Sequence, residues 1–258
     1  MQRMLKIINL KKNNQLSLDT FYFWKDVIQT IAARHFNNVP PGDVEQMLRN
    51  AQVHQGTSYV IFHNEKACGF GNTFYRSVTF GRKIKPYLIL DVCCMDNDVR
   101  GQHIFGMLSL REILRHKFSS RETLFRKTYA LVICLTPLAY LTETMLPVRW
   151  SLMNPLSPKQ RAIYDAILTS YCHEFKINYA GFEKPIHCET WIPFSTSDIK
   201  NKEDVRVQQF LKFNPDWKAG NGLGIIFPMG FRNFISLFLV LIFYQMKNLF
   251  YFLRKKHE

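Results

Sequence analysis

Glycine and proline are scarce in this sequence, with 12 and 11 copies among 258 residues. Their scarcity excludes a collagen-like or low-complexity chain, in which these residues dominate. Charged residues make up only 21% of the chain and hydrophobic residues 47%, which excludes general disorder. The composition is therefore globular, the length fits one or two domains, and phenylalanine is abundant, with 22 copies.

Acidic residues are also in short supply. There are 20 Asp and Glu against 34 Lys and Arg, which gives a formal net charge of +14. Such an excess favours anionic partners: nucleic acid, anionic lipid, phosphorylated cofactors or an acidic carrier protein. The basic residues are scattered, however, and no zinc-finger or other nucleic-acid-binding pattern accompanies them. We therefore expect no nucleic-acid partner.

The sequence lacks the apolar stretch of a secretory leader, because its N-terminus reads MQRMLKIINLKK. Its six cysteines are therefore not expected to form a secreted disulfide framework, and we expect a reducing, cytoplasmic setting. Cys93 and Cys94 point to opposite faces of a predicted strand, which disfavours a shared role. The dipeptides Cys-His at 172–173 and His-Cys at 187–188 have the wrong spacing for a zinc knuckle. We predict no metal site.

Hydrophobic periodicity and turn residues predict alternating helices and strands, and hence an α+β fold. Ser17, Ser157 and the pair Thr136-Pro137 are typical of helix starts. The stretch 176–222 is polar, so we expect it to be irregular, and the glycines at 222 and 224 predict a hairpin or bulge. The expected elements, in chain order, are a strand at 4–10, helices at about 17–35 and 43–52, strands at 58–63, 67–77 and 87–95, a helix from about 100 to 117, a strand at 129–135, a helix from 137 to about 146, a strand at 148–153, a helix from 157 to about 175 and a strand at 222–227.

An almost continuous apolar segment lies near the C-terminus. Residues 234–253 read FISLFLVLIFYQMKNLFYFL, a run of 20 residues with one formal charge, Lys247. A helix of this length spans about 30 Å, the thickness of a bilayer's hydrocarbon core, and basic residues flank it at Arg232 and Arg254–Lys256. We predict that residues 229–258 form an apolar, basic-ended helix that spans a membrane or lies in its interface, on the cytoplasmic side. A helix docked on protein and a poorly ordered tail are the alternatives.

The most informative stretch is residues 88–108, which read LILDVCCMDNDVRGQHIFGML. An apolar strand runs into a polar turn, then into Arg100-Gly101-Gln102 and an amphipathic helix. Free N–H groups and the positive dipole end make a helix N-terminus a site for anions. Gly101 allows the backbone to approach closely, and the Arg100 guanidinium can hold a phosphate in a forked contact. The pattern therefore predicts a phosphate-binding turn.

This stretch resembles the GNAT superfamily of N-acyltransferases, in which Arg/Gln-x-x-Gly-x-Gly/Ala begins a helix that binds the pyrophosphate of acyl-CoA. Here the six residues are 100–105, and the two small positions hold His103 and Phe105. Superfamily relatives that take acyl chains from acyl carrier protein often lack those glycines too. The predicted element order from residue 4 to about 153 is also the family order.

The resemblance implies a GNAT-like, mixed, mostly antiparallel sheet flanked by helices. It implies an acyltransferase domain over residues 1–228, with a C-terminal extension from about 154. It further implies an acyl-CoA or acyl carrier protein thioester as donor and a small-molecule amine as acceptor. The backbone of Cys93, Cys94 and Met95 would bind the donor's pantetheine arm. The residues that would bind its phosphates are Arg100, Gly101, Gln102, His103 and Gly106.

In such an enzyme the amine attacks the thioester directly, so a base must accept a proton from it. The candidates are Asp91 on the motif strand, Glu143 on a later helix, and His103. Apolar neighbours would raise the pKa of Asp91, although a structural hydrogen bond is the alternative role. Glu143 occupies the slot where many family members carry an acidic Tyr, and Tyr140 lies one turn away, where it could substitute or simply pack.

Two other functions compete with acyl transfer. A catalytically inert acyl- or lipid-binding protein with the same fold is favoured by the filled glycine positions and the missing Tyr. A basic nucleic-acid-binding protein would show a steep loss of affinity with salt. We therefore expect an acyltransferase and keep the inert binder as the first alternative.

Overall fold

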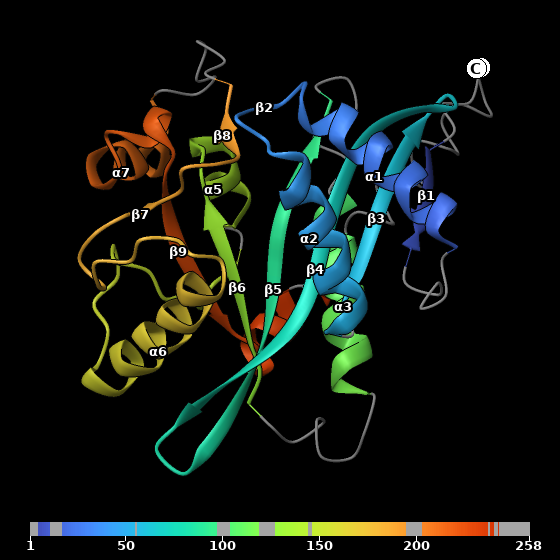
Figure 1. Cartoon of the computed structure of the whole chain (residues 1–258). Coiled ribbons are helices and arrows are strands. Elements are labelled where there is room, and N and C mark those ends of the chain that lie inside the picture. The colour runs from blue at the N-terminus through green and yellow to red at the C-terminus, as the bar shows by residue number, and fades with distance from the viewer. Residues whose placement is uncertain are drawn as a thin grey trace, which may run out of the picture.

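Seven strands form one sheet in the computed structural model (Figure 1). The structure describes residues 5–10, 17–54, 56–96, 104–118, 127–143, 146–194, 203–236, 238–239 and 242. In spatial order the strands are β1 (Leu5–Asn9), β3 (Thr57–His63), β4 (Lys66–Phe80), β5 (Lys83–Met95), β6 (Tyr129–Cys134), β9 (Asn221–Pro228) and β7 (Ile186–His187). Neighbouring strands are antiparallel except β5 and β6, which run parallel. The predicted α+β class with a mostly antiparallel sheet is confirmed.

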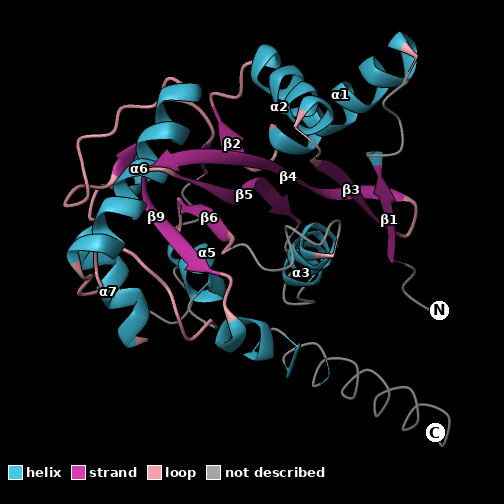
Figure 2. Ribbon diagram, turned by 90° about the horizontal axis from the view of Figure 1, so that it is seen from below, coloured by secondary structure: helices cyan, strands magenta, loops and turns pink. Residues whose placement is uncertain are grey.

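Helices cover both faces of the sheet (Figure 2). On one face lie α1 (Leu18–Ala32), α2 (Pro41–Val53) and α6 (Pro158–Glu174), and on the other lie α3 (Ile104–Lys117), α5 (Pro137–Glu143) and α7 (Val205–Phe213). A second, two-stranded sheet joins β2 (Phe36–Asn37) to β8 (Ile192–Pro193), and a short 3₁₀ helix, η3 (Trp217–Ala219), precedes β9. Each face of the main sheet is therefore buried against its own helical layer.

All three predicted helix starts carry the expected caps; at α5 the Thr136 hydroxyl accepts a hydrogen bond from the Ala139 backbone at 3.1 Å. The Ser17 side chain accepts a hydrogen bond from the Thr20 backbone at the start of α1. Ser157 and Gln160 form a reciprocal capping box at α6, with Pro158 in the first turn. These caps satisfy backbone donors that a helix start leaves unpaired.

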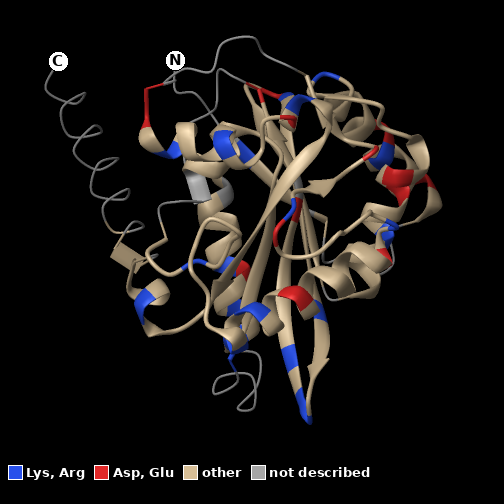
Figure 3. Cartoon of the chain, turned by 90° about the vertical axis from the view of Figure 1, so that its left-hand side faces the viewer, with Lys and Arg blue, Asp and Glu red and all other residues tan. Residues whose placement is uncertain are grey.

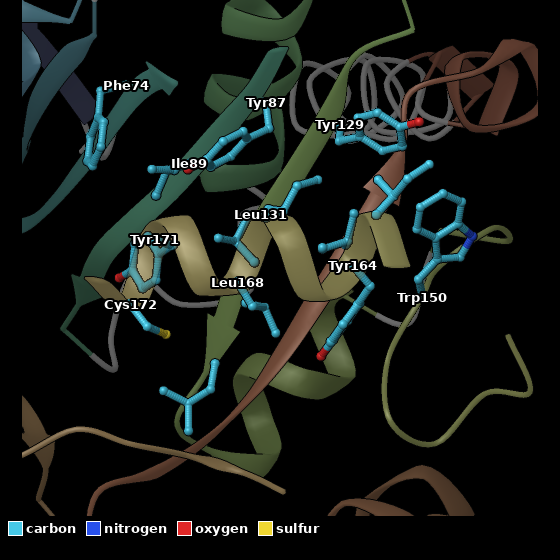
Figure 4. Packing of buried hydrophobic residues seen from close by; sticks show 14 residues of the cluster. Phe74, Tyr87, Ile89, Tyr129, Leu131, Trp150, Tyr164, Leu168, Tyr171 and Cys172 are labelled. Carbon is cyan, nitrogen blue, oxygen red and sulfur yellow. The ribbon is translucent and has the colours of Figure 1, made fainter. Parts of the chain in front are cut away.

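Helix α6 packs on the sheet through large side chains (Figure 4). Tyr164 and Leu168 lie buried between this helix and the strands, and the Tyr164 hydroxyl donates to the Gly224 carbonyl at 2.8 Å. A Cβ atom at Gly224 would lie 2.9 Å from the Leu168 Cδ1 atom and 3.0 Å from the Tyr164 hydroxyl. Gly224 is therefore needed for the close approach of α6 to β9.

Replacing Gly224 with Ala is expected to lower the free energy of unfolding by about 1–3 kcal/mol, because the added methyl overpacks this contact. Urea unfolding followed by circular dichroism measures the loss. Gly42→Ala is the matched control, since a Cβ atom there meets nothing within 4 Å and α2 should keep or gain stability. Equal unfolding midpoints for the two variants would contradict the close-packing account.

The structure corrects three predictions about the C-terminal half. Residues 148–153 are not a strand: Trp150 makes one isolated bridge to Ile226, and the chain then turns, with the Asn154 N–H donating to the Ser151 carbonyl at 3.0 Å. The stretch 176–222 is not irregular throughout, since it contains β7, β8, α7 and η3. Gly222 and Gly224 lie inside β9 rather than in a hairpin or bulge, pressed against side chains of β6 and α6.

The β4–β5 hairpin is longer than the periodicity predicts. Pairing runs from Gly69 with Met95 to Phe80 with Lys83, and Gly81 turns the chain with a φ of 59°. The last part of this hairpin extends beyond the sheet (Figure 1). Its polar residues, Ser77 and Thr79, are exposed there, so the strand continues without the apolar alternation that would reveal it.

Candidate functional site

Strands β5 and β6 diverge at their carboxyl ends (Figure 1). Their parallel pairing covers only four positions, from Tyr87 with Tyr129 to Leu90 with Val132. Strand β5 then continues to Met95 while paired with β4 alone, and β6 continues to Cys134 while paired with β9. Beyond Leu90, the side of β5 that faces β6 therefore has no strand partner within the described residues.

The directions of the backbone N–H and C=O groups at the end of β5 follow from its pairing with β4. The Asp96 N–H donates to the Cys68 carbonyl at 2.7 Å, so Asp96 points its backbone groups at β4. Because these groups alternate in direction along an antiparallel pair, Cys94 also faces β4, and Cys93 and Met95 face away. The N–H groups of Cys93 and Met95 are thus directed to the side where β6 diverges. Donors in this position suit a developing oxyanion.

A β-bulge begins where the two strands part. The register of β4 and β5 shifts between Gly71, which faces Cys93, and Thr73, which faces Leu90. Two residues of β5, starting with Asp91, therefore stand opposite the single residue Asn72. A bulge of this kind redirects side chains at the point where pairing ends, and here it redirects Asp91.

The Asp91 carboxylate lies on the face of the sheet covered by α2 and α6. It accepts a hydrogen bond from the Asn72 amide at 3.3 Å, and that amide also contacts the Met47 carbonyl of α2 at 3.3 Å. The Ser58 hydroxyl donates to the Asn72 carbonyl oxygen at 2.8 Å, so the amide is held from both ends. Asp91 itself is half-buried. It is therefore a carboxylate that is held by the Asn72 amide and keeps partial access to solvent.

The charge of Asp91 affects two further polar side chains, Tyr171 and Cys188. Burial raises the pKa of Tyr171 well above its ordinary value, and the Asp91 charge adds to that rise. Burial likewise raises the pKa of Cys188 to about 11, again with a contribution from Asp91. Both groups are therefore neutral near pH 7.

An ionic cluster that the sequence does not predict lies at the end of β5. Asp96 bonds the His35 imidazole at 2.8 Å and the Arg34 guanidinium at 2.9 Å, and Arg34 also donates to the Ala67 carbonyl at 2.8 Å. The cluster ties the end of α1 to the end of β5. His35 and Asp96 are 61 residues apart in sequence, so no local spacing reveals the contact.

The structure places the predicted donor-binding residues unequally. Cys93 is exposed, whereas Cys94 is buried on the side of the sheet covered by α1 and α2, and Met95 is buried on the opposite side against α3. Gly106 is exposed in the first turn of α3. Arg100, Gly101, Gln102 and His103 lie outside the described residues.

Tyr140 is not brought together with Asp91. Tyr140 is buried on the opposite face of the sheet, where its ring packs on Phe210 and burial raises its pKa. Glu143 is the last residue of α5, and its side chain lies outside the described set. Within the described residues, Asp91 and the His35–Asp96 pair are therefore the candidate proton acceptors near the end of β5. No group of three or more His, Cys, Asp or Glu side chains there could hold a metal ion.

Comparisons with known proteins give similarity at the level of solved structures only. No family model and no curated protein matches the chain. One similar structure is a mutant of the AtaT toxin bound to acetyl-CoA and to the C-terminus of the antitoxin AtaR. It has a TM-score of 0.35 and 14% identity over 55% of this chain and 81% of that chain.

Two further structures are similar to a comparable degree. A GNAT-family acetyltransferase from Streptococcus pneumoniae gives a TM-score of 0.36 and 11% identity, over 59% of this chain and 92% of that chain. A GCN5-related N-acetyltransferase from Kribbella flavida gives 0.37 and 11%, over 58% of this chain and 36% of that chain. These proteins are acetyltransferases of the superfamily that residues 100–105 resemble. TM-scores below 0.5 carry no argument about function. The function proposed below therefore rests on the strands and side chains of this chain alone.

Proposed function

We propose that this protein is an N-acyltransferase that moves an acyl group from a thioester donor to an amine by direct attack. The observation that carries the proposal is the early end of β5–β6 pairing, beyond which the N–H groups of Cys93 and Met95 point toward the side where β6 diverges, beside a bulge that carries Asp91. Donors for an oxyanion and a carboxylate base are the two groups that thioester aminolysis requires.

The proposed chemistry needs no covalent enzyme intermediate. The amine nitrogen attacks the thioester carbonyl carbon, and the carbonyl oxygen becomes an oxyanion that accepts a hydrogen bond from a β5 N–H group. Asp91 accepts the proton that the attacking nitrogen loses. The carbon–sulfur bond then breaks, and the thiolate leaves and takes up a proton to become the free thiol. The products are an N-acyl amine and the thiol of the carrier.

Acyl-CoA and acyl carrier protein thioesters present the same phosphopantetheine arm, so both fit the strand ends. Arg100, Gly101, Gln102 and His103 would bind the donor's phosphates, and the bulky residues His103 and Phe105 favour a long-chain donor over acetyl-CoA. Arg100→Glu should therefore raise the apparent Kd for the donor, because it sets a carboxylate against its phosphates.

A turnover assay tests the proposal. The full chain is incubated with acetyl-, octanoyl- or palmitoyl-CoA, or with acyl carrier protein thioesters, and a panel of primary amines. Release of free thiol is followed by a disulfide reagent, and the N-acyl product by mass spectrometry. We expect thiol release only when an amine is present. Saturable donor binding without any product would instead identify an inert acyl-binding protein, and no binding of any thioester would contradict both functions.

Cysteine alkylation tests where the donor binds. Iodoacetamide should modify the exposed Cys93 fastest, and a bound acyl-CoA should protect it. Cys188 should react slowly near pH 7, because its raised pKa of about 11 leaves little thiolate, and its rate should grow about tenfold per pH unit until that value. Peptide mass spectrometry separates the sites, and Cys93→Ser is the control. Unchanged Cys93 labelling at saturating acyl-CoA would place the donor elsewhere.

A further inference from the structure

One end of the main sheet combines a long hairpin with the first helical residues after β9. Strands β5 and β6 both begin at this end, and β9 ends there, because Tyr129 pairs with Tyr87 on one side and with Pro228 on the other. The Met229 N–H donates to the Thr128 carbonyl at 2.8 Å. The chain that follows β9 therefore leaves the sheet beside the start of β6, opposite the end that carries the candidate site.

Basic residues, blue in Figure 3, lie along the hairpin at this end. In the parallel register, Lys85 lies two positions before Tyr87 and Lys127 two positions before Tyr129, so these lysines are neighbours. Lys159 lies in the first turn of α6, and burial, followed by the positive charges of Lys83, Lys127 and Lys159, lowers the pKa of Lys85. We call this group, with Arg82 at the hairpin tip, the basic cluster.

The basic cluster is not neutralised from within. No ion pair joins any of its five members to an acidic side chain of the described part of the chain. Helix α6 offers its own cations nearby, and the hairpin contributes cations from both its turn and its strand. Like charges held this close repel each other, so an anionic partner would stabilise the arrangement.

An apolar stripe begins next to the basic cluster. Residues 231–236, 238, 239 and 242 are helical, and the helix packs inward through Asn233, which is buried, and Phe234. Its outward side is apolar and exposed, with 79% of Phe231 and 61% of Phe238 accessible. The exposed apolar members are Phe231, Ile235, Phe238, Leu239 and Ile242. Their spacing of i, i+4, i+7, i+8 and i+11 places them along one side of a helix.

We propose that the basic cluster and the apolar stripe together dock the protein on the surface of an anionic membrane. A bilayer interface supplies both chemistries at once, phosphate groups for the lysines and acyl chains for the phenylalanines. Ile84, at 59% exposure between Lys83 and Lys85, adds an apolar side chain at the hairpin itself. No helix within the described residues is long and apolar enough to cross a membrane. The contact proposed for the stripe is with the interface.

The other occupants fit this face less well. A nucleic acid would neutralise the lysines but gain nothing from a row of exposed phenylalanine and aliphatic side chains on a neighbouring helix. A second copy docked by a two-fold axis would place the same patch on both sides of the interface and bring the two basic clusters together. The combination of both surfaces is what favours lipid.

Vesicle co-sedimentation of the full chain tests the proposal. Vesicles of phosphatidylcholine alone are compared with vesicles that also contain phosphatidylserine. We expect binding to the anionic vesicles, weaker binding at high salt, and little binding to the neutral ones. The double variants Lys83→Glu/Lys85→Glu and Phe231→Ser/Phe238→Ser should each weaken the anionic binding at least about tenfold. Circular dichroism confirms that each variant is folded.

Matched controls lie away from this face. Lys66→Glu reverses an exposed charge in the β3–β4 turn, and Leu18→Ser removes an apolar side chain that is 71% exposed at the start of α1. Both should bind vesicles like the parent chain. Equal binding to both vesicle types, insensitivity to the lysine variant, binding to nucleic acid instead, or a dimer that the phenylalanine variant dissociates would each overturn the proposal. Turnover of a soluble acyl-CoA should not change in the docking variants, so this test is independent of the proposed function.

Discussion

Asp91→Asn is expected to lower kcat for amine acylation by about 100- to 10,000-fold, the range that general-base catalysis contributes. The substitution keeps the size of the side chain and can still hydrogen-bond with the Asn72 amide, so the bulge should persist. What it removes is the ability to accept a proton from the attacking amine. Thiol release at saturating donor measures kcat, and the pH dependence of kcat should lose its acidic limb in the variant.

Donor binding separates this result from simple loss of structure. Because the thioester is proposed to contact backbone groups of Cys93 and Met95, Asp91→Asn should leave the acyl-CoA Kd within about twofold of the parent value. Asp26→Asn, which neutralises an exposed carboxylate on α1, is the control for a change of charge alone. An Asp91→Asn enzyme with parental kcat would remove Asp91 from the mechanism.

The His35–Asp96 pair provides the competing assignment. His35→Gln keeps a hydrogen-bonding side chain beside Asp96 but removes a group that can carry a proton near neutral pH. If His35→Gln abolished the acidic limb while Asp91→Asn did not, the base would be His35, with Asp96 as its positioning residue. We expect the reverse, because Asp91 lies at the bulge where β5 and β6 separate.

The N-terminal half of the fold could be predicted because its signals are local. Ser17 and the α1 periodicity lie within one helix, and the β3–β4 hairpin turns within residues 63–66. The motif strand and the helix after it are adjacent in sequence, so the predicted place of Asp91 on the motif strand follows from the same stretch.

The C-terminal half depends on contacts between residues far apart in sequence. Strand β9 pairs with β6, which lies about ninety residues earlier in the chain. The glycines at 222 and 224 are packed against Ile133 and Leu168, which are too distant in sequence for a local pattern to reveal the contact. Helix α7 is only nine residues long, and of these only Val207 and Phe210 are buried, which is too few for a clear period. The polar composition of residues 176–222 therefore fits short helices and strands at the surface as well as it fits a loop.

Only the part of the candidate site that lies on the motif strand could be predicted from the sequence. Asp91 and Cys93–Met95 are placed by the motif strand itself, whereas His35 and Arg34 reach Asp96 through the packing of α1 on β4. Tyr140 shows what spacing leaves open. From its place on α5 it could act as an acid or pack, and in the structure its ring is buried against Phe210. The position of a residue along a helix fixes the side of the helix on which its side chain lies. Which other elements that side chain meets depends on how the helix packs in the fold.

Glu112→Ala is expected to lower the free energy of unfolding by about 1–3 kcal/mol, because it leaves the buried Tyr59 hydroxyl without its acceptor and removes the ion pair with the partly exposed Arg115. Glu112 is completely buried on α3, where its carboxylate pairs with Arg115 at 2.6 Å and accepts the Tyr59 hydroxyl proton in a hydrogen bond. Arg115 also donates to the Thr57 hydroxyl at 3.2 Å. Removing the carboxylate therefore leaves a guanidinium and a phenol that were both satisfied by it.

Denaturant unfolding measures the effect, with Glu45→Ala as the control, because the Glu45–Arg49 pair on α2 is solvent-accessible and screened by water, so its loss should lower stability much less. Glu112→Gln covers the case in which the alanine variant fails to fold, since it keeps a hydrogen bond to Tyr59 and loses only the charge; its loss should be smaller than that of Glu112→Ala. Equal midpoints for Glu112→Ala and the parent would contradict the account.

The pair also bears on function, because Glu112 fixes α3 against β3 and α3 begins at Ile104, directly after the residues proposed to bind the donor's phosphates. The glutamine variant should accordingly raise the apparent Kd for acyl-CoA more than Gly224→Ala, whose strain lies on the α6 side of the sheet.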